Sequence, residues 1–140
     1  MTARVKKLSA LFFVALQILN VQAAHAQADQ CSKASTHVEE RKCLEALASE
    51  ADNRLAQAEK NAIGMIAEWD EEPAYRSQAK KALEASNLAF RKYRTSQCGF
   101  AWSLAAGGNG ATDMRLSCAI ELTENRVRLI ESSSHSLKKR

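Results

Sequence analysis

The sequence predicts an all-α domain: a small antiparallel helical hairpin with a third helix, stapled by disulfides. Apolar residues recur every three or four positions along three long stretches of the chain, which is the spacing of one helix face. No stretch shows sustained alternation of apolar and polar residues, and no internal repeat is visible. A single Pro and 5 Gly in 140 residues disfavour a sandwich or barrel of many short strands, and the length fits one domain.

The first 26 residues have the composition of a secretory signal peptide. Arg4, Lys6 and Lys7 precede an apolar run over residues 8–21, and a small-x-small cleavage site, AHA at residues 24–26, follows it. The apolar run is too short for a comfortable membrane span. Cleavage after residue 26 would remove it and leave no membrane anchor; an uncleaved N-terminal anchor is the alternative. We therefore expect a periplasmic or secreted protein.

The net charge does not indicate a nucleic-acid partner. The chain carries 20 Lys+Arg against 16 Asp+Glu, a formal charge of +4. Three of the basic residues belong to the predicted signal peptide, so the mature chain has 17 basic against 16 acidic residues. This near-neutral balance excludes nucleic-acid binding through bulk charge.

The first predicted helix extends from about Thr36 to Glu68. Thr36 and Glu39 have the spacing of a capping box, in which each side chain accepts a hydrogen bond from the backbone N–H of the other residue. Apolar or small residues then recur at steps of three and four and form one face: Leu44, Leu47, Ala51, Leu55, Ala58, Ala62, Ile66 and Trp69. Charged residues occupy the intervening positions, which indicates a solvated opposite face.

Pro73 marks the first turn of the second predicted helix, which extends to about Cys98. Its helical repeat consists of Tyr75, Ala79, Ala82, Ser86, Ala89, Phe90 and Tyr93. Residues 105–110 (AAGGNG) predict a loop, after which Thr112 or Asp113 caps the third helix. The apolar face of the third helix consists of Leu116, Ala119, Ile120, Leu122, Val127 and Ile130. The helical domain therefore occupies residues 27–131, and residues 132–140 form a polar, basic tail.

All four cysteines, Cys31, Cys43, Cys98 and Cys118, lie in the mature chain. An even number in an exported protein indicates disulfides, and the lack of a C-x-x-C motif or a His pair disfavours zinc. A hairpin that turns near Asp70 brings all four to one end of the bundle, so three pairings are open. We favour Cys31–Cys43 with Cys98–Cys118 because short loops close easily; the rival, Cys43–Cys98 with Cys31–Cys118, joins helix to helix directly.

No arrangement of residues in the sequence predicts catalysis. His37 and His135 have no carboxylate or cysteine partner at ligand spacing, no Ser has the G-x-S-x-G context, and residues 107–110 lack the Lys-Ser/Thr of a phosphate loop. We therefore expect no catalytic residues, no metal and no cofactor. An enzyme is therefore less well supported by the sequence than a protein that acts by binding a partner.

Two segments stand out by composition, residues 90–98 (FRKYRTSQC) and residues 118–126 (CAIELTENR). In a structural interpretation Phe90 and Tyr93 pack in the core, and Arg94 or Arg126 pairs with an acid such as Asp52 on another helix. In a functional interpretation the two arginines donate to an acidic surface of a protein partner. The sequence leaves both interpretations open.

These segments resemble the lysozyme inhibitor LprI N-terminal domain family, whose members are small exported bacterial helical domains. The family pattern has an early Cys pair, Ala-Asp-x-x-Leu, aromatic-x-x-Tyr-Arg-x-x-x-Cys, a Gly-rich loop and Cys-x-x-x-Leu-Thr-x-x-Arg-x-x-Leu. The matching positions are Cys31, Cys43, Ala51, Asp52, Leu55, Phe90, Tyr93, Arg94, Cys98, Gly107, Gly108, Cys118, Leu122, Thr123, Arg126 and Leu129. Ala56 and Glu59 depart from the usual Asn and Tyr, and Asn87 and Phe90 depart from the usual Gln and Trp.

The resemblance implies a protein-binding module that inhibits lysozyme-type peptidoglycan hydrolases. Such an inhibitor would occlude a cleft that holds two catalytic carboxylates, with a basic or polar loop as the plug. The candidate partner-binding or structural residues are Asp52, Tyr93, Arg94, Asn109, Thr123 and Arg126. The alternative function is a structural or interaction protein of the bacterial envelope with a non-hydrolase partner and no enzymatic activity.

Overall fold

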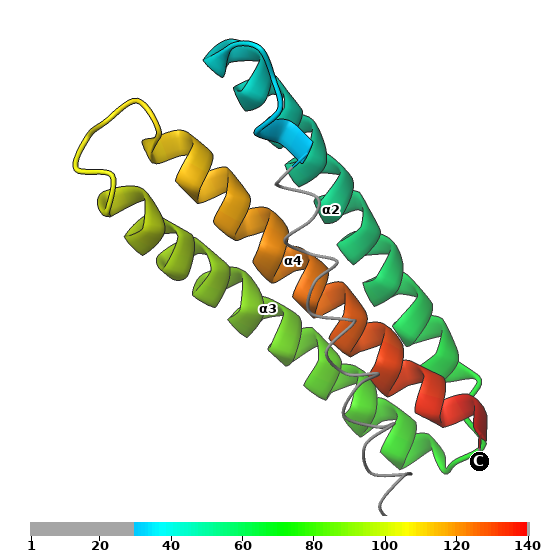
Figure 1. Ribbon diagram of the computed structural model, residues 1–140. Helices are drawn as coiled ribbons and strands as arrows, with labels where there is room; N and C mark the ends of the chain where they lie inside the picture. The colour runs from blue at the N-terminus through cyan, green and yellow to red at the C-terminus, as the bar shows by residue number, and fades with distance from the viewer. Residues whose placement is uncertain (1–29, 140) are drawn as a thin grey trace, which may run out of the picture.

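The computed structural model describes residues 30–139 as three long helices and one short one (Figure 1). They are α2 (His37–Ala67), α3 (Pro73–Ser103), α4 (Ala111–His135) and the 3-10 helix η1 (Ser136–Lys139). Within residues 30–139 there is no strand, so the predicted all-α class is confirmed. The predicted signal peptide, residues 1–26, lies outside the described residues and stays a prediction.

The central element of the fold is α4. In Figure 1, α2 and α3 run antiparallel and diverge from their connecting turn, and α4 returns beside α3 to lie between them. Most of the contact between helices is made by α4, whereas α2 and α3 touch each other little. The predicted hairpin with a third helix is therefore present, and the third helix fills the space between the two arms.

The start and the inner face of α2 agree with the sequence prediction. Both hydrogen bonds of the capping box are formed, from the backbone N–H of Glu39 to the Thr36 hydroxyl and from that of Thr36 to the Glu39 carboxylate. Six of the eight predicted face residues are buried: Leu44, Ala51, Leu55, Ala58, Ala62 and Ile66. The helix therefore forms where a good N-cap precedes an apolar stripe that meets the core.

The core lies between α2 and α4 in two clusters. The first contains Cys31, Leu44 and Ile120, near the start of α2. The second is farther along both helices and contains Leu55, Ala58, Ala62, Val127 and Ile130, with Leu83 and Phe90 of α3 packed against it. Alanines on α2 leave room for the larger side chains of α4, so the two helices approach closely.

Three predicted boundaries need correction. The second helix does not end near Cys98 but continues to Ser103. The third helix begins at Ala111 after Gly110, without a side-chain cap, so the prediction of a Thr112 or Asp113 cap is wrong. The carboxylate of Asp113 is instead bound by Arg41 of α2. Residues 132–139, predicted as a tail, are helical, and the Ser134 hydroxyl donates to the Ile130 carbonyl.

The orientation of α3 also differs from the expectation. Tyr93, expected in the core, is 54% exposed, and Tyr75, which starts the same helical repeat, is 55% exposed. Only Asn87 and Cys98 of this helix are buried. The helix therefore turns Asn87 and Arg94 inward beside Leu83, Phe90 and Cys98, and turns part of its apolar repeat outward.

No helix within residues 30–139 is both long enough and apolar enough to span a bilayer.

Candidate functional site

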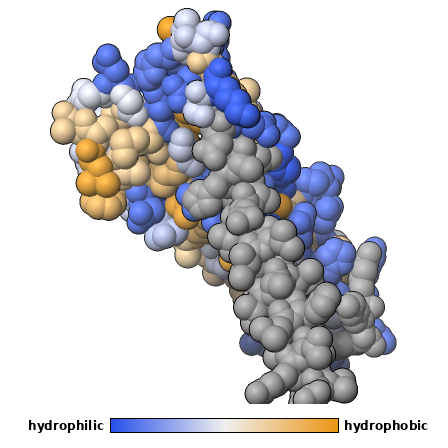
Figure 2. Space-filling model, viewed as in Figure 1, coloured by the Kyte–Doolittle hydropathy of each residue, from blue (hydrophilic) through white to orange (hydrophobic). Residues whose placement is uncertain are grey.

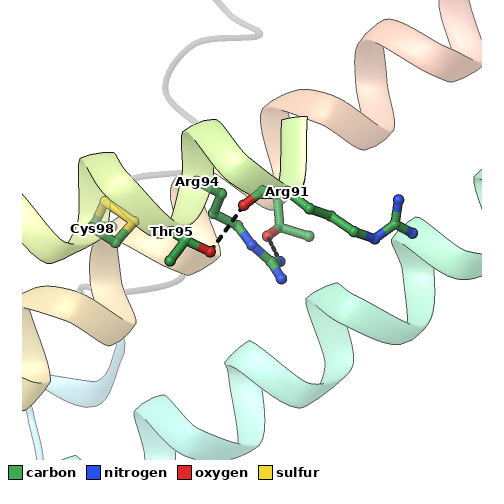
Figure 3. The surroundings of a disulfide bond; sticks show 6 residues. Arg91, Arg94, Thr95 and Cys98 are labelled. Atoms are coloured by element: carbon green, nitrogen blue, oxygen red, sulfur yellow. Dashed lines mark hydrogen bonds between the residues drawn. A yellow bond between two sulfur atoms is a disulfide. The ribbon is translucent and has the colours of Figure 1, made fainter. Parts of the chain in front are cut away.

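Two disulfides close the end of the bundle where α2 and α4 begin and α3 ends. Cys31 is bonded to Cys43 with Cα atoms 5.6 Å apart, and Cys98 to Cys118 with Cα atoms 5.5 Å apart. The favoured pairing is confirmed, and residues 30–139 contain no free cysteine. The first bond fastens the segment before α2 to that helix. The second, shown in Figure 3, joins α3 to α4 across the Gly-rich loop.

Arg94 connects all three long helices. Its Nη1 donates to Asp52 Oδ1 on α2 and, at 2.7 Å, to Thr123 Oγ1 on α4. Figure 3 shows the side chain reaching from α3 away from its own helix axis, one turn before Cys98. Thr123 is 1% exposed, so its hydroxyl has a protein partner in place of water. The structural pairing of Arg94 with Asp52 that the sequence suggested is present.

Arg126 joins α4 to α3 through neutral groups. Its Nη2 donates to Ser86 Oγ at 2.9 Å and to Asn87 Oδ1 at 2.8 Å. Phe90 is close to both arginines, with the guanidinium carbons of Arg94 and Arg126 5.8 and 5.7 Å from its ring centroid. Both cations are thus within range of a cation–π attraction to one ring, and the aromatic position becomes part of a polar network.

Further ion pairs flank this network on α2. Arg54 donates to Glu124 of α4 and to Glu50 one turn earlier on its own helix. Its hydrogen bond to Glu124 raises the pKa of Arg54 above the ordinary value, and the nearby charges of both acids add to the shift. Arg91 of α3 donates to Glu59 of α2 at 2.8 Å. The pairs Arg54–Glu124 and Arg91–Glu59 each join two helices and so help to fix their relative positions.

A second polar group ties the Gly-rich loop to α2. Arg41 donates to the Asp113 carboxylate and, at 3.1 Å, to the backbone carbonyl of Asn109. His37 Nε2 lies 3.3 Å from Asp113 Oδ2. The hydrogen bond to Asp113 raises the pKa of Arg41 above its ordinary value. The loop reverses direction through left-handed backbone conformations at Ala106 (φ 48°) and Gly107 (φ 78°).

The structure divides the six predicted site residues into two groups. Asp52, Arg94, Thr123 and Arg126 come together in the network between the helices. Tyr93 and Asn109 are exposed, on α3 and at the loop. The division bears on function, because side chains already bonded to other helices are less free to contact a partner.

Sequence reasoning missed Asn87, which is 7% exposed and holds Arg126. It also missed the pairing of Arg54 with Glu124. A signal for Asn87 exists in the spacing, because Asn87, Phe90, Arg94 and Cys98 follow one another at steps of three and four and so share a helix face. Asn87 and Arg94 are polar residues that are unusual in a core, so the sequence did not indicate that this face points inward.

This network is suited to holding helices in place. Each guanidinium in it donates to a side chain on a different helix, and two of the acceptors, Thr123 and Asn87, are buried. Within the described part of the chain, no group of three or more His, Cys, Asp or Glu side chains could hold a metal ion. The polar residues of the predicted motifs therefore brace the fold.

These features define a small, disulfide-closed three-helix domain in which the polar motif residues, such as Arg94 and Arg126, make contacts within the domain. The sequence model of the family described as lysozyme inhibitor LprI matches residues 28–129 of the chain. The chain belongs to this family, as the sequence resemblance implied. A search of curated proteins and a search of solved structures each give no match.

Proposed function

We propose that the protein is an exported protein-binding module that inhibits a lysozyme-type peptidoglycan hydrolase. The observation that carries this proposal is membership of the lysozyme inhibitor LprI family over residues 28–129. The two disulfides support export, because such bonds form and persist in oxidising compartments. The site of action is then the periplasm or the exterior of the cell.

The physical character of the domain suits inhibition by binding. An inhibitor gains affinity when its contact surface is already ordered, since little conformational entropy is lost on association. One end of this bundle carries both disulfides, and Arg41 fixes the loop beside them through Asp113 and the Asn109 carbonyl. Recognition requires only such a rigid surface and no reactive group.

The proposal is tested by measuring cell-wall lysis. The oxidised mature chain is added to hydrolases of several lysozyme classes, and the rate of loss of turbidity of a peptidoglycan suspension is recorded. We expect at least one hydrolase to be inhibited at nanomolar concentration, and reduced, alkylated protein to inhibit far less. Absence of inhibition of every class at micromolar concentration contradicts the proposal. Recovery of a single non-hydrolase partner from envelope extract would then favour the envelope interaction protein.

A further inference from the structure

The exposed apolar side chains of this domain are concentrated on one helix. Nine large hydrophobic residues of the described chain are exposed, and six of them belong to α3 or to its C-cap: Tyr75, Leu88, Tyr93, Phe100, Trp102 and Leu104. The same helix buries Asn87 and directs Arg94 inward. A helix that hides polar groups and exposes large apolar ones has an outer face suited to another molecule.

Four of these residues form what we call the α3 tip, namely Tyr93, Phe100, Trp102 and Leu104. They are 54%, 57%, 46% and 60% exposed. Steps of seven and four residues place Tyr93, Phe100 and Leu104 on one side of the helix, and Trp102 lies on the opposite side of the last turn. In Figure 2 apolar surface gathers over the end of α3 and the loop that follows it. The end of the helix is thus apolar on two sides, a shape that fits a recess better than a flat surface.

Three of the four residues of the α3 tip, Phe100, Trp102 and Leu104, lie in an uncharged interval. Residues 95–112 contain no Asp, Glu, Lys, Arg or His, although charged residues make up 26% of the chain. Basic residues adjoin only Tyr93, and of these Arg94 is bonded to Asp52 and Thr123. A membrane-surface helix or a nucleic-acid site would need basic residues beside its apolar or aromatic groups. A protein recess lined by apolar or aromatic side chains needs none. The uncharged interval therefore favours a protein partner.

The end of α3 is also held rigidly. The disulfide from Cys98 to Cys118 anchors it between Tyr93 and Phe100, and Arg94 fixes the preceding turn to α2 and α4. Large side chains on a rigid support are the usual anchors of tight protein interfaces. The tip thus needs little ordering when it binds.

A second copy of the chain is a poorer occupant of this surface. With about half of each side chain exposed, the four residues offer on the order of 400 Å², given about 150–250 Å² for a whole aromatic side chain. Two copies of such a convex tip meet along one side of each, so a symmetric dimer buries at most roughly 800 Å², below the ~1,200 Å² at which stable interfaces begin, and leaves either Trp102 or Phe100 and Leu104 uncovered. A cleft that encloses the tip would in addition contact the loop at residues 105–110.

We propose that the α3 tip inserts into the substrate cleft of the hydrolase, so that its uncharged aromatic and aliphatic side chains cover the surfaces on which sugar rings pack. This inference rests on the proposed inhibition and identifies its contact surface. The inhibition is then competitive with glycan and weakly dependent on salt, because the inserted end of the tip, Phe100, Trp102 and Leu104, lies in an uncharged interval. Arg94 and Arg126 act only by holding α3 in place.

The test compares two substitutions on the same helix. Phe100→Ala and Tyr75→Ala each remove an exposed aromatic ring, 57% and 55% exposed, but only Phe100 belongs to the tip. We expect Phe100→Ala to raise the inhibition constant at least about tenfold, as for an interface anchor, and Tyr75→Ala to change it less than about twofold. Trp102→Ala is expected to act like Phe100→Ala. Circular dichroism and thermal melting verify that all three variants fold.

Salt and competition give independent readings. The inhibition constant of the wild-type protein should change less than about threefold when salt rises from about 50 to about 500 mM. A soluble glycan that fills the cleft should displace the inhibitor.

If the wild-type protein inhibits but neither Phe100→Ala nor Trp102→Ala weakens it, the inference is wrong while the inhibitory function stands. If the wild-type protein inhibits nothing, the proposed function itself fails. A dimer of the wild-type protein that Phe100→Ala dissociates would assign the tip to a second copy and overturn the inference.

Discussion

Among single residues, Arg94 shows most clearly how one side chain can organise three helices. It donates to Asp52 and Thr123 and lies over Phe90, so its position depends on α2 and α4 as well as on its own helix. The sequence suggested Asp52 as its partner, since opposite charges on neighbouring helices are the simplest way to accommodate an inward Arg. The hydrogen bond to Thr123 and the burial of Asn87 depend on which face of α3 points toward α4. The spacing of the apolar residues in α3 did not indicate that face.

Replacing Arg94 should destabilise the fold while leaving the surface unchanged. Arg94→Ala leaves the buried Thr123 hydroxyl without its donor and removes the pair with Asp52. Because Asp52 is about half exposed, the ion pair contributes modestly, and we expect a loss of about 1–2 kcal/mol in the free energy of unfolding. Urea denaturation measures this loss. The control is Lys92→Ala, an exposed position on the same helix, for which a change within about 0.5 kcal/mol is expected. Equal effects of the two variants would contradict the structural role.

Among the helices, α2 and α3 differ in how much their sequences reveal. The apolar repeat of α2 coincides with the face that meets the core, so its ends were predicted to within one residue. In α3 only part of the predicted repeat faces outward, including Tyr75 and Tyr93, whereas Phe90 of the same repeat packs inside. Asn87 and Arg94, which are not in that repeat, also face inward, where they bond to α4. Hydrophobic periodicity identifies a helix reliably, but it assigns the inner face correctly only when the core is apolar.

The close packing of α2 against α4 depends on small side chains. Ala51 is fully buried in α2, whereas Ala56 on the same helix is exposed. Ala51→Leu forces a larger side chain into a filled space, and overpacking of this kind costs about 1–3 kcal/mol. Ala56→Leu, the matched control, should change stability by less than about 0.5 kcal/mol. Thermal melting of both variants distinguishes the two sites. An Ala51→Leu protein as stable as the wild type would show that α2 and α4 leave space for a larger side chain at this position.

The capping box provides a second test on α2. Thr36→Ala removes the side-chain acceptor for the Glu39 backbone N–H, and loss of an N-cap residue costs about 1 kcal/mol. Ser35→Ala changes an exposed neighbour that caps no helix and should be nearly neutral. The difference between the two unfolding free energies isolates the cap. If the two variants are equally stable, the capping hydrogen bond contributes nothing to the fold.

For the domain as one body, the disulfides determine where rigidity is concentrated. Both bonds lie at the end that carries the α3 tip, while the opposite end, where α2 turns into α3, has no disulfide and is joined by packing and by the hydrogen bond from Arg76 to the Ala67 carbonyl. The sequence predicted the oxidised state and, among three open pairings, favoured the one that forms, because short loops close at low entropic cost. It did not predict the uncharged tip as a contact surface, since Phe100, Trp102 and Leu104 lie beyond the expected end of the second helix.

Removal of the Cys98–Cys118 bond should separate stability from inhibition. Cys98→Ser with Cys118→Ser frees a loop of 20 residues and is expected to cost about 3 kcal/mol of unfolding free energy. The same pair of changes at Cys31 and Cys43 should cost about as much, since stabilisation depends only weakly on loop length. We expect only the first double variant to weaken inhibition strongly, because only that bond anchors α3 beside the tip. A similar weakening by both would indicate that rigidity of the whole end matters rather than the placement of the tip.

Calorimetric titration of a lysozyme-type hydrolase with the oxidised mature chain asks directly whether this domain works by recognition. The expected result is a 1:1 complex with nanomolar affinity, and no bond of the glycan is broken by the chain itself. No binding to any hydrolase class at micromolar concentration, or cleavage of glycan by the purified chain alone, would contradict it.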